Sequence, residues 1–116
     1  MFVLDMGRNS LGKIEQMHTF FEEHGVKIRK KYVQDSSPYF IIGSGTSISY
    51  RTRSKWNQKG IVFFCTEEDK NNLVEGLGVK AYDNSSDSDR PYAIFLSNKH
   101  FEEAVEILLK NSANQG

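Results

Sequence analysis

The chain contains three histidines and one cysteine, residue types that often bind metals or act as catalysts, and their spacing predicts neither role. His18, His24 and His100 show no metal-ligand spacing with one another or with Cys65. Cys65 precedes an expected helix, whose N-terminal dipole lowers a thiol pKa, but the acidic residues that follow oppose this effect. We therefore expect no catalytic residue, no metal ion and no cofactor.

Two loops contain ligand-like residues without the rest of a known motif. Residues 43–47 form a Gly-Ser turn that resembles a phosphate cradle, but neither a Gly-Lys-Ser or Gly-Lys-Thr triplet nor a helix follows it. Residues 83–89 are rich in Asp and Ser, but they lack the glycine and the final glutamate of a helix-loop-helix calcium site. We expect a tight turn and a polar hairpin tip.

Positive and negative charges cancel over the whole chain but are divided unevenly along it. Fifteen Lys and Arg balance fifteen Asp and Glu. Residues 1–60 hold ten Lys and Arg against five Asp and Glu, and residues 61–116 hold the reverse. Because the local potential steers association, such a chain can attract a polyanion despite its zero net charge.

Two expected strands carry cations at every second position, a spacing that gathers them on one face of a sheet. If helices cover the opposite face, both rows point to the open face, beside aromatic side chains that can stack on bases. We therefore predict a non-catalytic domain that binds nucleic acid, or another polyanion, with this face. The predicted phosphate contacts are Lys27, Arg29, Lys31, Arg51, Arg53 and Lys55, and the predicted stacking residues are Tyr50 and Trp56.

The same cations also have a purely structural explanation, because Lys and Arg on a sheet prevent edge-to-edge aggregation without any partner. Trp56 is equally compatible with ordinary packing. No ribonucleoprotein signature, Gly-x-x-Gly clamp or zinc-finger spacing accompanies the cations. The nucleic-acid hypothesis therefore depends on charge placement alone.

A second hypothesis is an interaction or inhibitor protein that binds a basic protein partner through its acidic C-terminal half. Solvated helix faces and a loop would explain the same acids without a partner. The acidic residues are Glu67, Glu68, Asp69, Asp83, Asp87, Asp89, Glu102, Glu103 and Glu106. A third hypothesis is a small-ligand site in a cleft between repeated units, although no residue identifies its ligand.

Hydrophobic periodicity predicts three helices and six strands. Apolar residues at spacings of three and four indicate helices over residues 10–23, 67–77 and 98–111. Apolar or alternating runs indicate strands over residues 26–33, 39–42, 46–53, 61–64, 79–82 and 91–96, with a hairpin turn at 34–37. This order favours an α+β fold, in which helices cover one face of a mainly antiparallel sheet.

Several residues recur at an offset of 53 positions with the same expected structural role. Gly25 and Gly78 each end a helix, and Pro38 and Pro91 each begin a returning strand. We interpret this pattern as a duplicated helix-hairpin (αββ) unit, with repeats at residues 9–53 and 61–97 and a closing helix at 98–111. A chain of 116 residues is long enough for one compact domain and too short for two, so we predict a single domain, 1–116.

The composition excludes several other classes of protein. Hydrophobic residues make up 38% of the chain and charged residues 26%, which is typical of globular proteins. No apolar run is long enough to span a membrane, and the first residues show no leader pattern. A single cysteine allows no internal disulfide. We expect a cytoplasmic protein that does not bind membranes.

Overall fold

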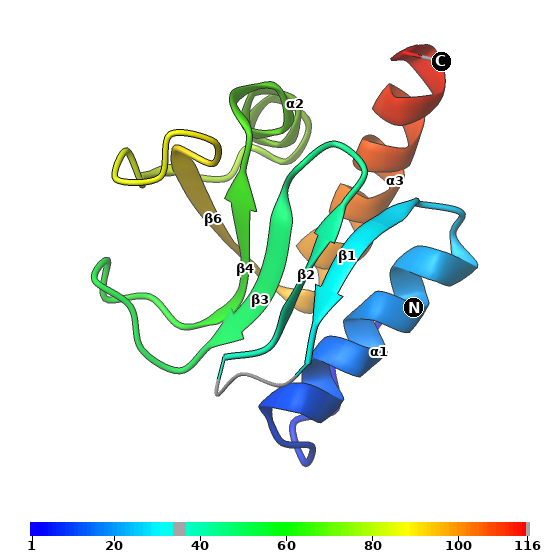
Figure 1. Cartoon of the computed structure of the whole chain (residues 1–116), viewed down its shortest axis with the longest axis vertical. Coiled ribbons are helices and arrows are strands. Elements are labelled where there is room, and N and C mark those ends of the chain that lie inside the picture. Colours follow the sequence, from blue (N-terminus) through cyan, green and yellow to red (C-terminus); the bar gives the residue numbers. More distant parts are fainter. Residues whose placement is uncertain (34–36, 116) are drawn as a thin grey trace.

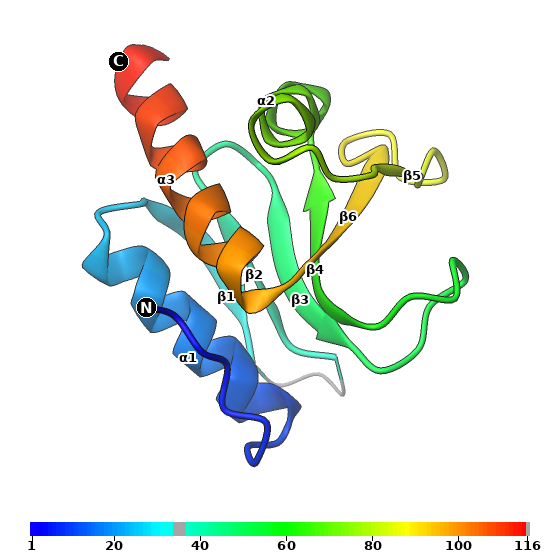
Figure 2. The same ribbon diagram turned by 180° about the vertical axis from the view of Figure 1, so that it is seen from behind.

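The computed structural model describes residues 1–33 and 37–115. In these residues, six antiparallel strands form one sheet, and three helices cover one of its faces (Figure 1 and Figure 2). The helices are α1 (Ser10–Glu23), α2 (Glu67–Leu77) and α3 (Asn98–Gln115). The strands are β1 (Ile28–Tyr32), β2 (Tyr39–Ile42), β3 (Ser47–Arg51), β4 (Gly60–Cys65), β5 (Tyr82–Asp83) and β6 (Tyr92–Leu96). Their order across the sheet is β1-β2-β3-β4-β6-β5. The predicted α+β class with a C-terminal helix is confirmed.

The helix boundaries follow from capping residues. α1 begins after Asn9, whose side chain accepts a hydrogen bond from the backbone N–H of Gly12. α2 begins after Thr66, whose hydroxyl accepts a hydrogen bond from the N–H of Asp69. It ends at Gly78, which adopts a left-handed φ of 67°. Because these signals are local, α1 and α2 begin where the sequence predicts.

The hydrophobic core lies between the sheet and the helices. Every second residue of the central strands points toward the helices, where Phe40, Phe63 and Ile94 are fully buried. Phe21 of α1 and Phe101 of α3 join them, with ring centroids 5.6 Å apart in an edge-to-face arrangement. The opposite side of the sheet, which we call the open face, is formed by the intervening residues, among them Tyr39, Ser47, Ser49, Arg51 and Phe64.

A β-bulge at Arg29 divides β1 into two registers. Ile28 pairs with Ile42, but Lys30 pairs with Ile41, so that two steps along β1 correspond to one step along β2. One extra residue exchanges the two faces of everything that follows it, because side chains alternate with a period of two. Lys30 therefore lies on the open face, the reverse of what unbroken alternation predicts.

The placement of two predicted site residues on the open face is wrong. Lys31 follows the bulge and points to the helix layer, where its Nζ lies 2.8 Å from Glu15 Oε1 of α1. Tyr50 also points to this layer, and the ammonium of Lys13 in α1 lies 5.0 Å from its ring centroid. Tyr50 shares its side of β3 with the buried Ile48 and not with Arg51, so the same strand alternation that brings Arg51 to the open face keeps Tyr50 away from it.

The two halves of the fold are similar in outline but not in detail. A helix precedes a hairpin at each end of the sheet, α1 before β1 and β2, and α2 before β5 and β6. However, β5 has two residues where β1 has five, and a duplicated αββ unit is not confirmed. α3 continues to Gln115, beyond its predicted end at residue 111. Residues 34–36 of the predicted turn lie outside the described residues.

Candidate nucleic-acid interface

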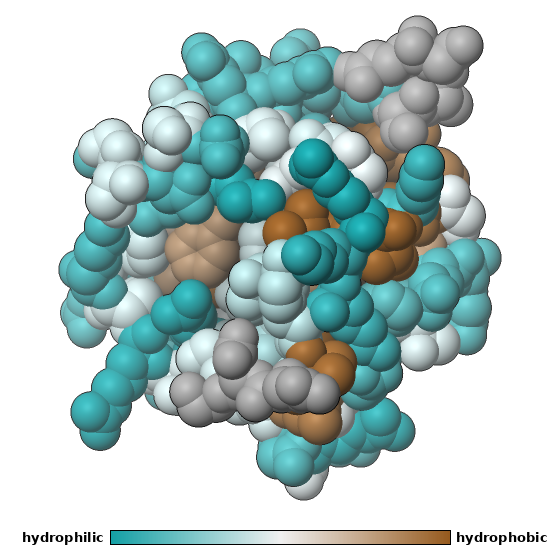
Figure 3. Space-filling model, viewed as in Figure 1, coloured by the Kyte–Doolittle hydropathy of each residue, from teal (hydrophilic) through white to brown (hydrophobic). Residues whose placement is uncertain are grey.

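The open face combines hydroxyl, cationic and aromatic side chains. Ser47, Ser49 and Arg51 project from alternate positions of β3. Tyr39 of β2 pairs with Ser49, and Phe64 of β4 pairs with Ser47, so these rings flank the same strand. Figure 3 shows a hydrophobic floor in a hollow between hydrophilic side chains of this face. Strand alternation therefore places polar and apolar contact groups side by side.

Aromatic side chains cross the open face from β1 to β5, and four of them carry a cation over the ring. This aromatic band consists of Tyr32, Tyr39, Trp56, Phe64, Tyr82 and Phe95. The cation-ring pairs and their distances to the ring centroid are Lys30 with Tyr32 (4.9 Å), Arg51 with Phe64 (5.3 Å), Lys55 with Trp56 (4.9 Å) and Lys80 with Tyr82 (4.8 Å). Such pairs keep charge and π-surface within one contact area.

The rings of the aromatic band also contact one another. Tyr32 and Tyr39 stack with centroids 4.5 Å apart, and Trp56 lies 6.3 Å from Phe64. A side-chain hydrogen bond with Tyr32 is the main cause that raises the pKa of Lys30 above its ordinary value of 10.5. The neighbouring Tyr32 therefore favours the charged form of Lys30 on the open face.

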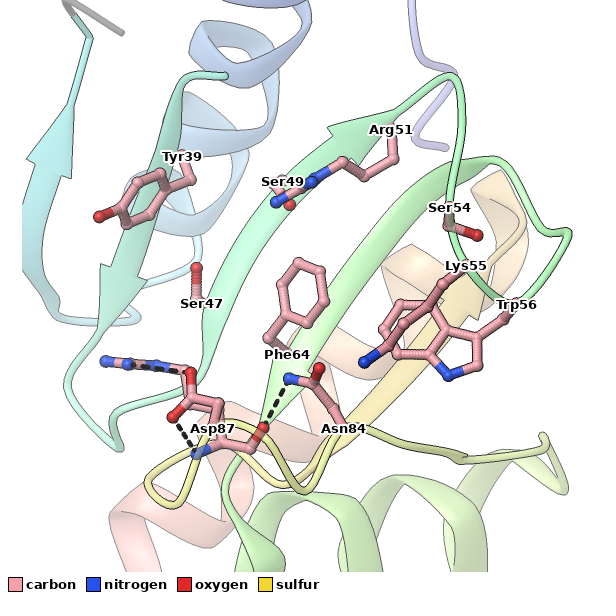
Figure 4. A pocket seen from close by; sticks show the side chains of 11 residues that line it. Tyr39, Ser47, Ser49, Arg51, Ser54, Lys55, Trp56, Phe64, Asn84 and Asp87 are labelled. Atoms are coloured by element: carbon pink, nitrogen blue, oxygen red, sulfur yellow. Dashed lines mark hydrogen bonds and ion pairs between the residues drawn. The ribbon is translucent and has the colours of Figure 1, made fainter. Parts of the chain in front are cut away.

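A pocket of about 480 Å³ opens on this face between the β3–β4 loop and the β5–β6 loop (Figure 4). Three cations line it from three separate segments: Arg51 from β3, Lys55 from the β3–β4 loop and Arg90 from the residues before β6. The other lining residues are Tyr39, Ser47, Ser49, Ser54, Trp56, Phe64, Asn84 and Asp87. The pocket therefore combines positive charge, hydroxyl groups and aromatic surface.

The β5–β6 loop is held in place by its own polar side chains. Asn84 Nδ2 donates to the carbonyl of Arg90 at 2.9 Å, and Asp87 Oδ1 accepts from the backbone N–H groups of Asp89 and Arg90. Arg90 Nε donates to the carbonyl of Gly45 in the β2–β3 turn at 2.7 Å. These bonds fix the Arg90 guanidinium at the wall of the pocket.

Hydrogen bonds within the β3–β4 loop and beyond it position Trp56. Ser54 Oγ donates to the carbonyl of Gln58 at 2.6 Å and accepts from the N–H of the same residue at 3.2 Å. Asn57 adopts a left-handed φ of 58°, which allows the chain to turn between them. Trp56 Nε1 donates to the carbonyl of Asp83 at 2.9 Å. The indole is thereby held over the sheet.

The hydroxyl of Ser49 is buried at the floor of the pocket without a protein partner. Ser49 is 3% exposed, and its Oγ forms no hydrogen bond to any of residues 1–33 and 37–115. A buried polar group without a partner costs about 1–3 kcal/mol relative to a bonded one. A ligand that reaches the floor and hydrogen-bonds this hydroxyl would recover that free energy.

The structure brings three of the eight predicted site residues together and separates two others from them. Arg51, Lys55 and Trp56 line the same pocket. Lys31 and Tyr50 lie on the helix side of the sheet, as described above. The pocket therefore retains only part of the predicted set.

The remaining three predicted residues lie at the margins of the open face. Arg29 reaches the β2–β3 turn, where its Nη1 lies 3.7 Å from the position that a Cβ would take at Gly45. Lys27 is exposed beside Gly43, whose N–H donates to the Lys27 carbonyl at 2.9 Å. Arg53 borders a separate hollow in the β3–β4 loop. Of these three, Arg29 is the one that reaches Gly45, whose carbonyl accepts the hydrogen bond from Arg90.

Sequence reasoning missed several residues of the site. Lys30 was excluded because the bulge at Arg29 has no glycine to signal it. The sequence predicts that Asn84 lies in a polar hairpin tip and that Arg90 directly follows this tip, but nothing in the nearby sequence shows that these residues reach the β2–β3 turn. Phe64 belongs to a continuous apolar run, in which both faces of the strand look buried.

Three of the nine acidic residues of the alternative hypothesis have separate roles in the fold. Asp69 is buried and accepts hydrogen bonds from the hydroxyls of Ser44 and Thr46. Glu102 accepts a hydrogen bond from the N-terminal backbone, and Asp87 braces the β5–β6 loop. These three carboxylates are therefore engaged within the chain and do not belong to a free acidic surface.

The described residues show neither a metal cluster nor a helix that could span a membrane. Within residues 1–33 and 37–115, no three His, Cys, Asp or Glu side chains gather in a way that could hold a metal ion. None of the helices in these ranges has the length and apolar character that a membrane crossing needs. Cys65 is buried, and burial, aided by the charge of Asp69, raises the pKa of its thiol.

Comparison with known proteins identifies no relative. The chain matches no protein-family model, and no curated protein or solved structure shows significant similarity to it. Function has therefore to be inferred from the open face and its pocket.

Proposed function

We propose that the protein binds single-stranded nucleic acid with the open face, without catalysing a reaction on it. In this proposal the cations contact phosphates and the aromatic band stacks on bases. The observation that carries it is the pairing of Lys30, Arg51, Lys55 and Lys80 with four rings of the band. Single-strand-binding proteins need this combination of backbone charge and stacking surface.

Charge on the open face favours a polyanion. Arg29 and Arg90 both reach Gly45 of the β2–β3 turn, which adds two cations to the four that lie over rings. The acid of the pocket, Asp87, accepts two backbone hydrogen bonds and lies 4.0 Å from the Arg90 guanidinium. Its charge is thereby partly compensated, and the face keeps an excess of positive charge.

The aromatic band favours single strands over duplexes. In a duplex the bases are stacked on one another, so that a protein ring cannot lie flat against them. Trp56, Phe64 and Tyr39 are half-buried, which leaves part of each ring accessible. Each base that stacks on such a ring contributes about 1–3 kcal/mol without requiring a particular sequence.

Titration with labelled oligonucleotides tests this proposal. Fluorescence anisotropy with single-stranded DNA, single-stranded RNA and duplex DNA, at about 50 mM and about 200 mM salt, should show tighter binding of single strands and weaker binding at higher salt. Absence of binding to all three at the lower salt concentration would overturn the proposal.

The β-bulge supplies a matched pair of control variants. Lys30→Gln removes a cation from the open face, whereas Lys31→Gln removes the neighbouring cation from the helix side. Lys30→Gln should lower the slope of log affinity against log salt by about 0.7, and Lys31→Gln should leave it unchanged. Equal effects of the two variants would exclude the open face as the binding surface.

A further inference from the structure

We propose that the pocket in the open face holds one nucleotide unit, with its phosphate between the pocket cations and its base against Trp56 and Phe64. This inference rests on the proposed function and names the ligand of its central site. The unit is either one nucleotide of a bound strand or a free nucleoside monophosphate, since both present the same chemistry.

The size of the pocket suits this ligand. Its volume of about 480 Å³ lies within the range of small-molecule sites, about 300–1,000 Å³. A duplex is too wide to enter such a space, whereas a single unstacked nucleotide is of the right order. Tyr39 lines the pocket and stacks on Tyr32, so a strand that leaves the pocket meets a second stacking surface.

Three cations from separate segments line the pocket, where each can contact a phosphate group. Arg51 and Lys55 form no ion pair with any of residues 1–33 and 37–115 and lie over aromatic rings. Arg90 is held in place by the Gly45 carbonyl. Because rotation about its side-chain bonds can move a guanidinium from a ring to a phosphate, Arg51 can exchange Phe64 for an anion.

The unpartnered hydroxyl of Ser49 independently indicates a ligand. It lies in a side chain that is 3% exposed, on the floor of the pocket, and no group of the described chain satisfies it. Buried polar groups are nearly always hydrogen-bonded, so an exception calls for a partner, which a bound molecule can supply. A nucleotide offers sugar hydroxyl groups, base edges and phosphate oxygens for this purpose.

The position of Trp56 favours a base over a simple anion. Its indole N–H is bonded to the Asp83 carbonyl, and its ring contacts Phe64, Tyr82 and Phe95. An indole restrained in this way loses little freedom when a base stacks on it. Inorganic phosphate gains nothing from this surface, so it should bind more weakly than a nucleotide.

Calorimetric titration with AMP, CMP, GMP, UMP and inorganic phosphate tests the inference, alongside the oligonucleotide titration. We expect saturable binding of at least one nucleotide, tighter than that of phosphate. Trp56→Ala should weaken nucleotide binding by about 5- to 150-fold, which is the loss of one stacked base. Lys31→Gln, on the other side of the sheet, should leave the affinity unchanged.

Ser49→Ala should change two measured quantities in opposite directions, the thermal stability of the free protein and its affinity for nucleotides. Removal of an unsatisfied hydroxyl should raise the midpoint of thermal unfolding of the free protein by about 3–6 °C. The same change should weaken nucleotide binding by about 3- to 10-fold, because the ligand loses a hydrogen bond. An unchanged affinity for nucleotides would overturn the inference, whatever happens to stability.

The outcomes separate this inference from the proposed function. One outcome is that oligonucleotides bind, that no nucleotide binds, and that Trp56→Ala leaves the affinity for oligonucleotides intact. In that case the open face binds strands, but the pocket is not a nucleotide site. Equal affinity for phosphate and for every nucleotide would likewise overturn it. If nucleotides bind and oligonucleotides do not, the pocket is a free-nucleotide site and the proposed function is wrong. If neither class binds, both proposals fail.

Discussion

Asp69 shows how one carboxylate joins the turn beside the open face to a helix. The residue is 4% exposed, and it accepts hydrogen bonds from the hydroxyls of Ser44 and Thr46 in the β2–β3 turn. Its own N–H donates to the Thr66 hydroxyl at the start of α2. The turn that contacts Arg90 is therefore tied to α2 through this side chain.

Asp69→Ala should lower the free energy of unfolding by about 2–4 kcal/mol, because two buried hydroxyls lose a charged acceptor. Urea denaturation followed by circular dichroism measures this change. Asp89→Ala, at an exposed position of the β5–β6 loop, is the matched control and should change stability by less than about 0.5 kcal/mol. A loss below about 1 kcal/mol for Asp69→Ala would contradict this role.

The buried thiol of Cys65 should make the fold less stable as the pH rises into the alkaline range. Burial is the main cause that raises the pKa of its thiol above 9.0, and the charge of Asp69 adds to it. Above pH 9 the unfolded chain loses this proton and the native chain keeps it. The native state then binds more protons than the unfolded state, so stability falls as pH rises.

Comparison with Cys65→Ala isolates this effect from other alkaline titrations. The difference in unfolding free energy between wild type and variant should be constant below pH 8. Above pH 9 the wild type should lose about 1.4 kcal/mol of stability relative to the variant for each further pH unit. Urea titrations at several pH values measure it. Parallel stability curves for the two proteins would contradict a protonated, buried thiol.

The secondary-structure elements show which features depend on nearby residues alone. α2 lies between two local signals, the Thr66 cap and the left-handed Gly78, and both are visible in the sequence. The bulge in β1 has no such signal, because it arises at Arg29 from pairing with β2. A single inserted position therefore put Lys31 on the wrong face in the sequence-based prediction.

Gly78→Ala tests the helix end separately from packing. No atom lies within 4 Å of the Cβ that the change would add, so the expected cost is conformational and amounts to about 1–2 kcal/mol. Thermal unfolding measures this cost. Gly43→Ala is a suitable control, because its φ lies outside the left-handed region and its new Cβ would make ordinary contacts. Similar losses for both variants would contradict the assignment.

The whole molecule separates a helical face, which contains the core, from a charged and aromatic open face. Charges that cancel in the composition are thereby sorted in space, with cations from both halves of the chain around one pocket. The cations of the open face are Lys30, Arg51, Lys55, Lys80 and Arg90, with Arg29 at its margin.

Salt dependence measures how many of these cations contact phosphate at once. If all of them do, log affinity for a single strand should fall with log salt at a slope of about −4. The double variant Arg51→Gln/Lys55→Gln should reduce the slope to about −3, because two contacts are lost. Anisotropy titrations over a range of salt concentrations give both values. A slope near zero would show that charge does not hold the strand.

The sequence alone determined the fold class, the three helices and most of the strands, since these depend on periodicity and caps within a few residues. It also placed Arg51, Lys55 and Trp56 near one another, because they are close neighbours in the chain. Tertiary structure alone decided that Arg90 joins them and that Lys30 replaces Lys31. Both outcomes depend on contacts between distant segments, Arg90 with Gly45 across 45 positions and β1 with β2 around a bulge. Local patterns carry no information about such contacts, because the packing of the completed sheet selects them.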